Sequence, residues 1–223
     1  MSRQLAFDLP LKQAQGREDF FVAPANALAL ATLDAPQGWP GRRMLLIGPE
    51  GAGKSHLAQI WADAEGALLL AATDLAEADI PTLATRAVVL EDAEALAGNP
   101  EAEEALFHLY NLAQAEGGTL LLTARMPPRD WGIVLPDLAS RMQALASVRI
   151  SPPDDALLTA VLVKLFNDRQ LTVAPQLIDW LVTRMDRSLA TARRLVAALD
   201  ARALAEGRKI SRQLAGEVLD SLD

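Results

Sequence analysis

The sequence contains no cysteine, only 4% aromatic residues and two histidines, His56 and His108, among its 223 residues. The absence of cysteine excludes disulfides, thiol nucleophiles and cysteine-ligated metal sites, and it fits a reducing compartment. No apolar run is long enough to cross a bilayer. Asp8 interrupts the apolar residues near the N-terminus, which argues against a signal peptide. We therefore expect a cytoplasmic protein without a membrane partner.

Basic charge is also scarce, because 21 lysines and arginines stand against 29 acidic residues, for a net charge of −8. A protein that grips nucleic acid directly usually presents a basic surface. The acidic balance therefore predicts that this protein reaches DNA only indirectly, through other proteins. Hydrophobic residues make up 51% of the chain. That share is enough for a sizeable core, built mostly from leucine, alanine and valine.

Short apolar runs alternate with helical periodicity through the first two thirds of the chain. The runs predict strands at residues 43–47, 67–71, 87–90, 119–123 and 146–150. The periodicity predicts helices at residues 25–33, 54–64 and 101–116. Strands that alternate with helices indicate an α/β fold with a parallel sheet.

The pattern changes after Ser151-Pro152-Pro153, a double proline that is typical of a boundary. From there on the sequence predicts helices alone, at residues 155–169, 175–184, 189–206 and 211–222. The expected organisation is an extended arm (residues 1–16), an α/β nucleotide-binding domain (17–152) and a small all-helical domain (153–223).

Residues 48–55 match the phosphate-binding pattern G-x-x-x-x-G-K-[ST]. Glycines let successive backbone N–H groups converge on phosphate oxygens, and the helix that follows points its positive end at the anion. A glycine-rich turn without a ligand is the alternative. The apolar run before the loop and the helix after it favour a site for ADP or ATP, with Mg²⁺ held by the serine hydroxyl. The residues of this predicted site are Gly48, Pro49, Glu50, Gly51, Ala52, Gly53, Lys54 and Ser55.

Two acids, Glu91 and Asp92, end the apolar run at residues 87–90. A carboxylate at the tip of a strand beside a phosphate loop can hold Mg²⁺, and a second can orient the attacking water. Adjacent residues of an extended chain point to opposite sides, so we assign Glu91 to the metal and Asp92 to catalysis. Solvated acids at a strand end are the alternative. Such strands usually end in aspartate at the metal position, and the longer Glu91 predicts slow turnover.

Four further stretches point in combination to one family. Residues 19–26 (DFFVAPAN) precede the loop, and residues 54–57 (KSHL) continue it. Residues 107–111 (FHLYN) and 135–142 (LPDLASRM) lie further along. Together they resemble the AAA+ core of the DnaA/Hda family of bacterial replication proteins. The last stretch, with residues 126–129 (MPPR), is most similar to its Hda branch. The likeness covers nearly the whole chain and implies an AAA+ base followed by a helical lid.

The ends of the chain also bear on this resemblance. Nothing like DnaA's N-terminal helicase-interaction domain precedes the core, and nothing like its C-terminal helix-turn-helix follows. The resemblance therefore implies an Hda-type regulator. Near the N-terminus, Leu5, Phe7 and Leu9 alternate with other residues, so an extended peptide would present them on one face, with Gln4 beside them. Packing on its own domain is the alternative. The resemblance implies binding to the sliding clamp, the beta subunit of DNA polymerase III.

The family also assigns roles to single residues. Arg141 stands where the family supplies an arginine finger to a neighbouring subunit's nucleotide, although an exposed arginine paired with Asp137 is the alternative. Thr123 stands where the family has a polar sensor of the γ-phosphate, and capping of the strand end is equally open. Arg125 is a weaker substitute. His56 is expected to pack beside the nucleotide.

The expected lid departs from the family at one position. The family's second-sensor arginine aligns with Ala190, and Arg193 and Arg194 follow one turn later on the same face. We select Arg194 as the substitute that reaches the nucleotide, with a solvated helix face as the alternative. If neither arginine reaches the nucleotide, we expect the protein to distinguish ATP from ADP in an unusual way or not at all.

The resemblance implies regulatory inactivation of the initiator DnaA. The protein would bind the clamp, dock on ATP-loaded DnaA and promote hydrolysis of DnaA-bound ATP through Arg141. Its own nucleotide would set its shape and its assembly as a homo-oligomer, with weak hydrolysis of its own. One alternative is a stand-alone AAA+ ATPase of the helicase-loader or clamp-loader type, which predicts rapid turnover. The other is a nucleotide-insensitive adaptor.

Overall fold

The computed structural model describes residues 17 and 20–222. The predicted arm, with the clamp-binding candidates Gln4, Leu5, Phe7 and Leu9, lies outside the described residues. In the described part no helix is long and apolar enough to cross a membrane.

A five-stranded parallel sheet forms the centre of the base, in the order β2-β3-β4-β1-β5. The strands are β1 (Arg43–Ile47), β2 (Leu68–Ala71), β3 (Ala87–Glu91), β4 (Thr119–Ala124) and β5 (Ser147–Arg149). Every residue of β1 and β4 is buried, because these central strands are apolar on both faces and are covered on both. The edge strand β2 is largely exposed.

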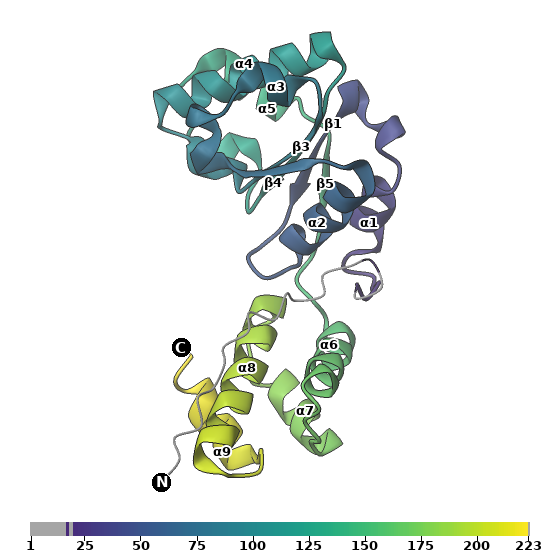
Figure 1. Ribbon diagram of the computed structural model, residues 1–223, viewed down its shortest axis with the longest axis vertical. Helices are drawn as coiled ribbons and strands as arrows, with labels where there is room; N and C mark the ends of the chain where they lie inside the picture. Colours follow the sequence, from purple (N-terminus) through teal and green to yellow (C-terminus); the bar gives the residue numbers. More distant parts are fainter. Residues whose placement is uncertain (1–16, 18–19, 223) are drawn as a thin grey trace, which may run out of the picture.

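Helices cover the two faces of this sheet (Figure 1). On one face α1 (Ala27–Leu33) and α2 (Lys54–Glu65) pack against Met44 and Leu46 of β1. On the other, the side chains of Leu45 and Ile47 belong to a cluster that includes residues of α3, α4 and α5. This alternation follows from the two-residue period of a strand. The helices of the second face are α3 (Ile80–Ala84), α4 (Pro100–Glu116) and α5 (Pro136–Gln143).

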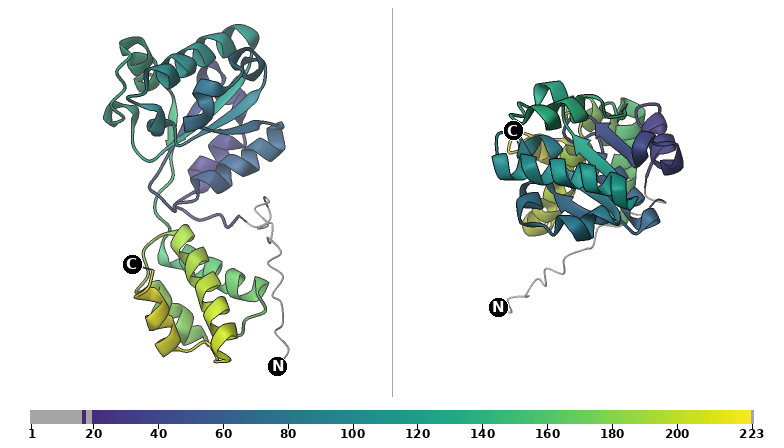
Figure 2. Two further views of the ribbon diagram at one scale, coloured as in Figure 1. Left: turned by 60° about the vertical axis from the view of Figure 1, so that its left-hand side comes forward. Right: turned by 90° about the horizontal axis from the view of Figure 1, so that it is seen from above.

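The C-terminal helices form a separate bundle with its own apolar core (Figure 2). They are α6 (Asp155–Asp168), α7 (Pro175–Val182), α8 (Leu189–Glu206) and α9 (Arg212–Leu219). The bundle touches the base through the start of α8. There the backbone N–H of Leu189 donates to the carbonyl oxygen of Gly51 at 2.8 Å. The bundle therefore contacts the base directly at the predicted phosphate loop.

The five predicted strands are all present, with ends that differ by at most one residue. The predicted helices are also found, but that at residues 25–33 begins at Ala27 and that at 211–222 covers Arg212–Leu219. The sequence patterns did not predict α3 or α5. Both helices are short, so neither shows a sustained apolar period. Each has a proline in its first two positions, Pro81 in α3 and Pro136 in α5.

Candidate nucleotide-binding site

The phosphate loop leaves β1 at Gly48 and enters α2 at Lys54. Gly51 and Gly53 have φ values of 72° and 106°, a region that L side chains rarely adopt. Gly48 is needed for a different reason, because a Cβ there would lie 2.3 Å from the Cγ2 atom of Ile150. The loop can therefore form only with glycine at these places, and its backbone N–H groups and the start of α2 provide an anion-binding seat.

Lys54 lies inside this loop, with only 7% of its surface exposed. Its ammonium donates to the carbonyl oxygens of Gly48 at 2.8 Å and Pro49 at 3.2 Å. Burial lowers the pKa of Lys54 from its ordinary value, against the opposing pull of Asp92 and Glu94. The ammonium is therefore held in place by the loop itself, ready to face phosphate oxygens.

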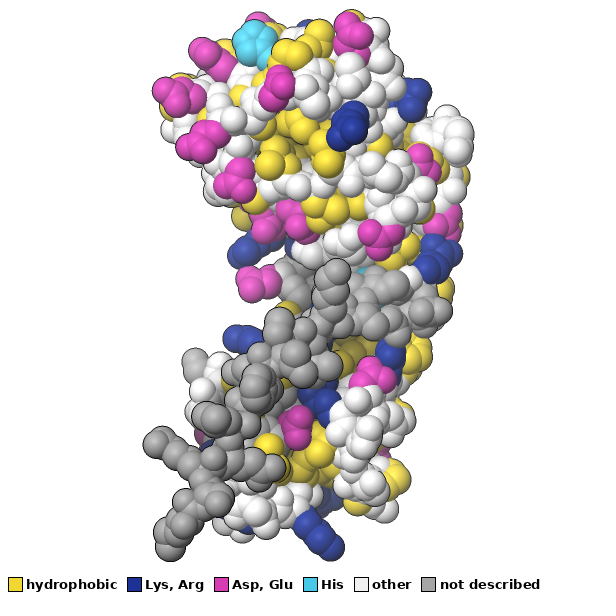
Figure 3. Space-filling model, viewed as in Figure 1, with side chains coloured by type: hydrophobic (Ala, Val, Ile, Leu, Met, Phe, Trp, Pro, Cys, Tyr) yellow, Lys and Arg dark blue, Asp and Glu magenta, His cyan; other side chains and the backbone are white. Residues whose placement is uncertain are grey.

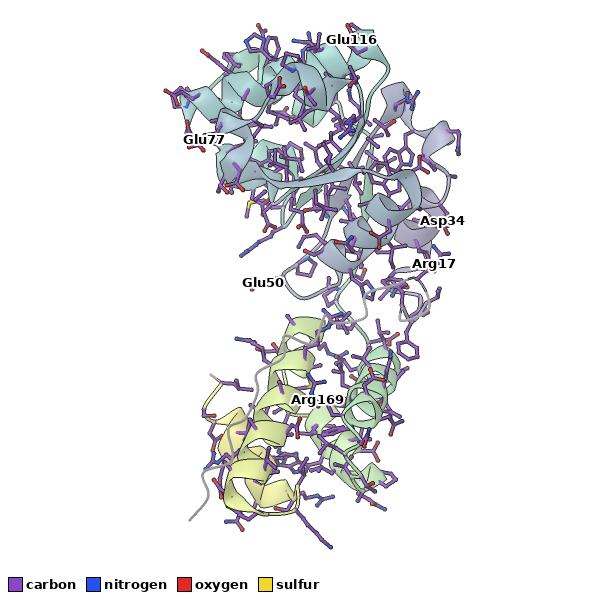
Figure 4. The ribbon with its side chains drawn as sticks, viewed as in Figure 1. Arg17, Asp34, Glu50, Glu77, Glu116 and Arg169 are labelled. Atoms are coloured by element: carbon purple, nitrogen blue, oxygen red, sulfur yellow. The ribbon has the colours of Figure 1, made fainter. Side chains whose placement is uncertain are left out.

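A pocket of about 240 Å³ opens at the mouth of the loop. The loop supplies one wall, the sheet edge supplies Asp92 and Arg125, and the first turn and a half of α8 supplies Ala190 and Arg193. Ser55 and His56 also line it. Five of the eight predicted loop residues, Glu50, Gly51, Gly53, Lys54 and Ser55, thus share this pocket with Asp92 and the start of α8. In Figure 4 the labelled Glu50 lies in the gap between the base and the helical bundle.

The two acids at the end of β3, Glu91 within the strand and Asp92 after it, take different positions. Asp92 lines the pocket and is exposed, and its φ of 51° turns the chain sharply after the strand. Glu91 is half-buried, and its Oε1 atom is buried without a hydrogen-bond partner. A buried carboxylate oxygen without a donor fits a cation or its bound water. The described residues hold no cluster of three His, Asp or Glu for a metal, so Mg²⁺ would rely on Ser55, Glu91 and phosphate oxygens.

Thr123 links two strand ends rather than lining the pocket. It is 1% exposed, and its hydroxyl accepts the backbone N–H of Asp92 at 3.0 Å. Its observed contact is therefore to the backbone at the end of β3, where it fixes the turn that carries Asp92.

Arg125, two residues further on, does line the pocket. Its guanidinium pairs with Glu50 of the loop at 3.0 Å and with Glu94 at 3.8 Å. The sequence offered Arg125 only as a weaker substitute for Thr123, and Glu50 and Glu94 are distant from it in sequence. The fold places all three at one edge of the phosphate loop.

The two lid arginines separate, and the structure corrects the predicted choice of position. Arg193 lines the phosphate-loop pocket, whereas Arg194 lines a different pocket between α7, α8 and α9 and lies 3.4 Å from the Thr191 hydroxyl. The cause is the turn of about 100° between neighbouring helical residues. Burial alone lowers the pKa of Arg193, and no carboxylate contributes a counter-charge among the described residues.

His56 is 7% exposed and its ring meets Phe20 edge to face, with the centroids 5.2 Å apart. It packs at the pocket wall, where the sequence placed it.

Arg141 lies on the other side of the base, in α5. Its guanidinium carbon is 5.2 Å from the centroid of the Phe107 ring and 5.4 Å from that of Tyr110, both in α4. Such stacking holds a guanidinium without neutralising its charge. The alternative pairing with Asp137 is not found among the described residues. Arg141 does not line the pocket of this chain's own phosphate loop.

Glu103 of α4 fixes the segment that leads into α5. Only 1% of it is exposed, and its carboxylate accepts backbone N–H groups from Gly98, Val134 and Leu135 at 2.7–3.1 Å. Burial raises its pKa, but the three N–H groups together outweigh burial and hold the pKa below its ordinary value. The sequence patterns did not predict a role for this residue. The available signal was an acid on the buried face of a helix, next to Ala102 and one turn before Leu106.

Comparisons with known proteins agree with this architecture. No family model matches the chain. It is 25% identical to the chromosomal replication initiator protein DnaA 2 of Chlamydia caviae, over 90% of this chain. The match covers 48% of that protein, so the chain spans about half the length of this curated relative.

The three-dimensional structure is also similar to solved structures. Domain III of DnaA from Thermotoga maritima matches with a TM-score of 0.78 at 19% identity, covering 96% of this chain and 98% of that one. AMPPCP-bound DnaA from Aquifex aeolicus matches with a TM-score of 0.71 at 17% identity, covering 85% and 66%. The predicted fold class is thereby confirmed, and the chain has the fold of an AAA+ domain. Within that class it has the fold of domain III of DnaA, a DnaA-related AAA+ ATPase fold.

Proposed function

We propose that this protein is a cytoplasmic regulator that inactivates the replication initiator DnaA by promoting hydrolysis of DnaA-bound ATP. The observation that carries the proposal is Arg141. Its guanidinium stacks on two aromatic rings, forms no ion pair with a carboxylate among the described residues and does not line the pocket of the chain's own phosphate loop. An arginine in that setting suits a nucleotide held by a neighbouring protein. The DnaA-like fold supports DnaA as that neighbour, since like AAA+ domains associate side by side.

The chain's own pocket would bind ADP or ATP. Lys54, Arg125 and Arg193 place three cations around the loop, and related DnaA proteins have been solved with AMPPCP. In this proposal Ser55 and Glu91 hold Mg²⁺, which would neutralise phosphate charge, and Asp92 orients water. Thr123 would act through the turn that carries Asp92. Bound nucleotide would determine how the start of α8 contacts the loop at Gly51. It would thereby determine the orientation of the helical bundle for assembly with DnaA or with further copies of this chain.

The sliding clamp is the second proposed partner. Gln4, Leu5, Phe7 and Leu9 would bind it, and the protein would reach DNA only through the clamp and DnaA. The net charge of −8 supports this indirect route.

The deciding experiment measures hydrolysis of DnaA-bound ATP in the presence of clamp loaded on DNA. The intact protein should accelerate it, and the Gln4→Ala variant should lose the acceleration at limiting concentration, when tethering to the clamp matters most. Loss with Arg141→Ala but not with Gln4→Ala would retain the arginine finger and remove the clamp from the proposal. No acceleration by a folded, nucleotide-bound protein would reject the regulator as a whole.

A stand-alone ATPase is the main rival. The three cations at the pocket favour it, whereas Glu91 at the metal position disfavours it. Rapid turnover without DnaA would support it. The nucleotide-insensitive adaptor is disfavoured by Arg193, which faces the pocket in spite of Ala190.

Arg193 and Arg194 provide a matched pair for testing the pocket. We expect Arg193→Ala to weaken ATP binding by about 10-fold, because it removes one charge-assisted contact to phosphate. Arg194→Ala should change the affinity by less than about 2-fold, since its side chain lies in the other pocket. Titration calorimetry with ATP measures both. A larger loss from Arg194→Ala would contradict the observed placement.

A further inference from the structure

An apolar groove of about 490 Å³ lies between α3 and the second half of α4. α3 leads into β3 and α4 leads into β4, so the groove lies at the amino ends of the strands. The phosphate loop follows the carboxyl end of β1, at the opposite end of the sheet. The groove is thus separate from the nucleotide site. Its lining is Ile80, Pro81, His108, Asn111, Leu112 and Ala115.

Acidic side chains surround this groove. In α3, α4 and residues 72–79 before α3, the sequence has seven Asp and Glu and no Lys or Arg. Figure 3 shows acidic side chains around apolar ones over α3 and α4, and Figure 4 shows Glu116 at the top of the base and Glu77 at its left-hand edge. Six exposed acids in the segment before α3 and on α4 form no ion pair among the described residues. They are Asp74, Glu77, Asp79, Glu101, Glu104 and Glu116.

Charge elsewhere on the molecule is arranged differently. In the lid, four arginines lie within 4 Å of a carboxylate, namely Arg169, Arg187, Arg202 and Arg208. The charge around the groove is therefore left uncompensated within the described part of the chain. Clustered like charges repel one another, and a partner of opposite charge relieves that repulsion.

The sign of the charge selects the kind of partner. Nucleic acid and anionic membrane surfaces are repelled by a negative rim, whereas a basic protein segment is attracted. The apolar floor adds a place for a hydrophobic anchor, and a trough between two helices suits a helical segment. We propose that this acidic groove binds a basic amphipathic helix of a partner protein, with one or two apolar anchors in the groove and Lys or Arg against its rim. This contact goes beyond the proposed roles of Arg141 and of residues 4–9.

The test uses the full chain and synthetic helical peptides of about 18 residues, in which leucines at i, i+3, i+4 and i+7 form one face and lysines the rest. One control peptide has glutamate in place of lysine, and another spreads the same leucines around the helix. Fluorescence anisotropy measures binding. We expect binding of the basic amphipathic peptide alone, weakening as salt screens the rim charges.

Two variants locate the contact. Ala115→Trp fills the groove without changing charge, and Glu104→Lys/Glu116→Lys reverses part of the rim. Each should lower the affinity for the basic amphipathic peptide by about 10-fold or more. The control Glu65→Lys/Asp179→Lys makes the same charge change at exposed acids away from the groove. It should lower the affinity for the peptide by less than about 3-fold.

The proposal is overturned if both charge variants weaken binding equally, because that result shows general attraction. It is also overturned if Ala115→Trp has no effect, if the scrambled peptide binds as well, or if a single-stranded oligonucleotide competes for the groove. Sedimentation of the intact chain and of Ala115→Trp tests whether a second copy of this chain occupies the groove. Self-association that Ala115→Trp abolishes would assign the groove to a second copy of this chain. None of these outcomes depends on hydrolysis of DnaA-bound ATP.

Discussion

Replacing Arg141 by alanine is expected to slow the stimulated hydrolysis of DnaA-bound ATP by about 10³-fold or more, the usual contribution of an arginine finger. The physical reason is that a guanidinium stabilises charge that develops on the transferring phosphoryl group. Arg141→Lys should recover little of the rate. An ammonium does not stack on Phe107 and Tyr110 as a planar guanidinium does, and it cannot donate two parallel hydrogen bonds. Single-turnover hydrolysis of radiolabelled ATP bound to DnaA, with clamp on DNA, measures the effect.

Two controls separate this role from folding and from nucleotide binding. Arg129→Ala removes a guanidinium whose side chain is 76% exposed and should leave the stimulated rate unchanged. Affinity of the Arg141→Ala protein for its own nucleotide should equal that of the intact chain, because Arg141 does not line its pocket. A variant that still stimulates hydrolysis to within about 10-fold of the intact protein would contradict an arginine finger at this position.

The sequence predicted most accurately those parts of the structure that neighbouring residues specify. The strand, loop and first residue of the helix around the phosphate loop follow from adjacent residues, because glycine, lysine and an apolar run specify that unit with little help from the rest of the chain. The parallel sheet also follows, because an apolar run without alternation requires cover on both faces. The short helix α5 was missed, since its eight residues depend on packing against α4 more than on a local period.

The site was harder to predict because several of its contacts depend on how separate elements meet. Arg193 and Arg194 are adjacent, and only the orientation of α8 against the loop decides which of them faces the pocket. The pair of Arg125 with Glu50 joins the end of β4 to the phosphate loop, across 75 residues of sequence. Thr123 was correctly placed at a strand tip, but its bond to the Asp92 backbone follows from strand order in the sheet.

Glu103 is the clearest case of a residue whose importance lies in the folded structure. One carboxylate satisfies three backbone N–H groups in two loops, and the second loop leads directly into α5 and Arg141. We expect Glu103→Ala to lower the free energy of unfolding by about 3–5 kcal/mol, because buried N–H groups left without acceptors cost roughly 1–3 kcal/mol each. The matched variant Glu104→Ala removes an exposed acid one position along the same helix, and should change stability by less than about 0.5 kcal/mol.

The pH dependence gives a second test of Glu103. Its pKa in the folded protein is lowered, so its ionised form contributes stability above its unfolded value of about 4.3, and that contribution is lost as the pH falls through the lower folded value. Glu103→Gln keeps the shape but loses the charge and one acceptor. It should therefore be less stable than the intact chain at pH 7, with a gap that narrows below about pH 4.3. Urea unfolding at pH 7 and pH 3 measures both proteins. A gap that stays constant between these pH values, or equal losses from Glu103→Ala and Glu104→Ala, would show that the carboxylate does not hold the entry to α5.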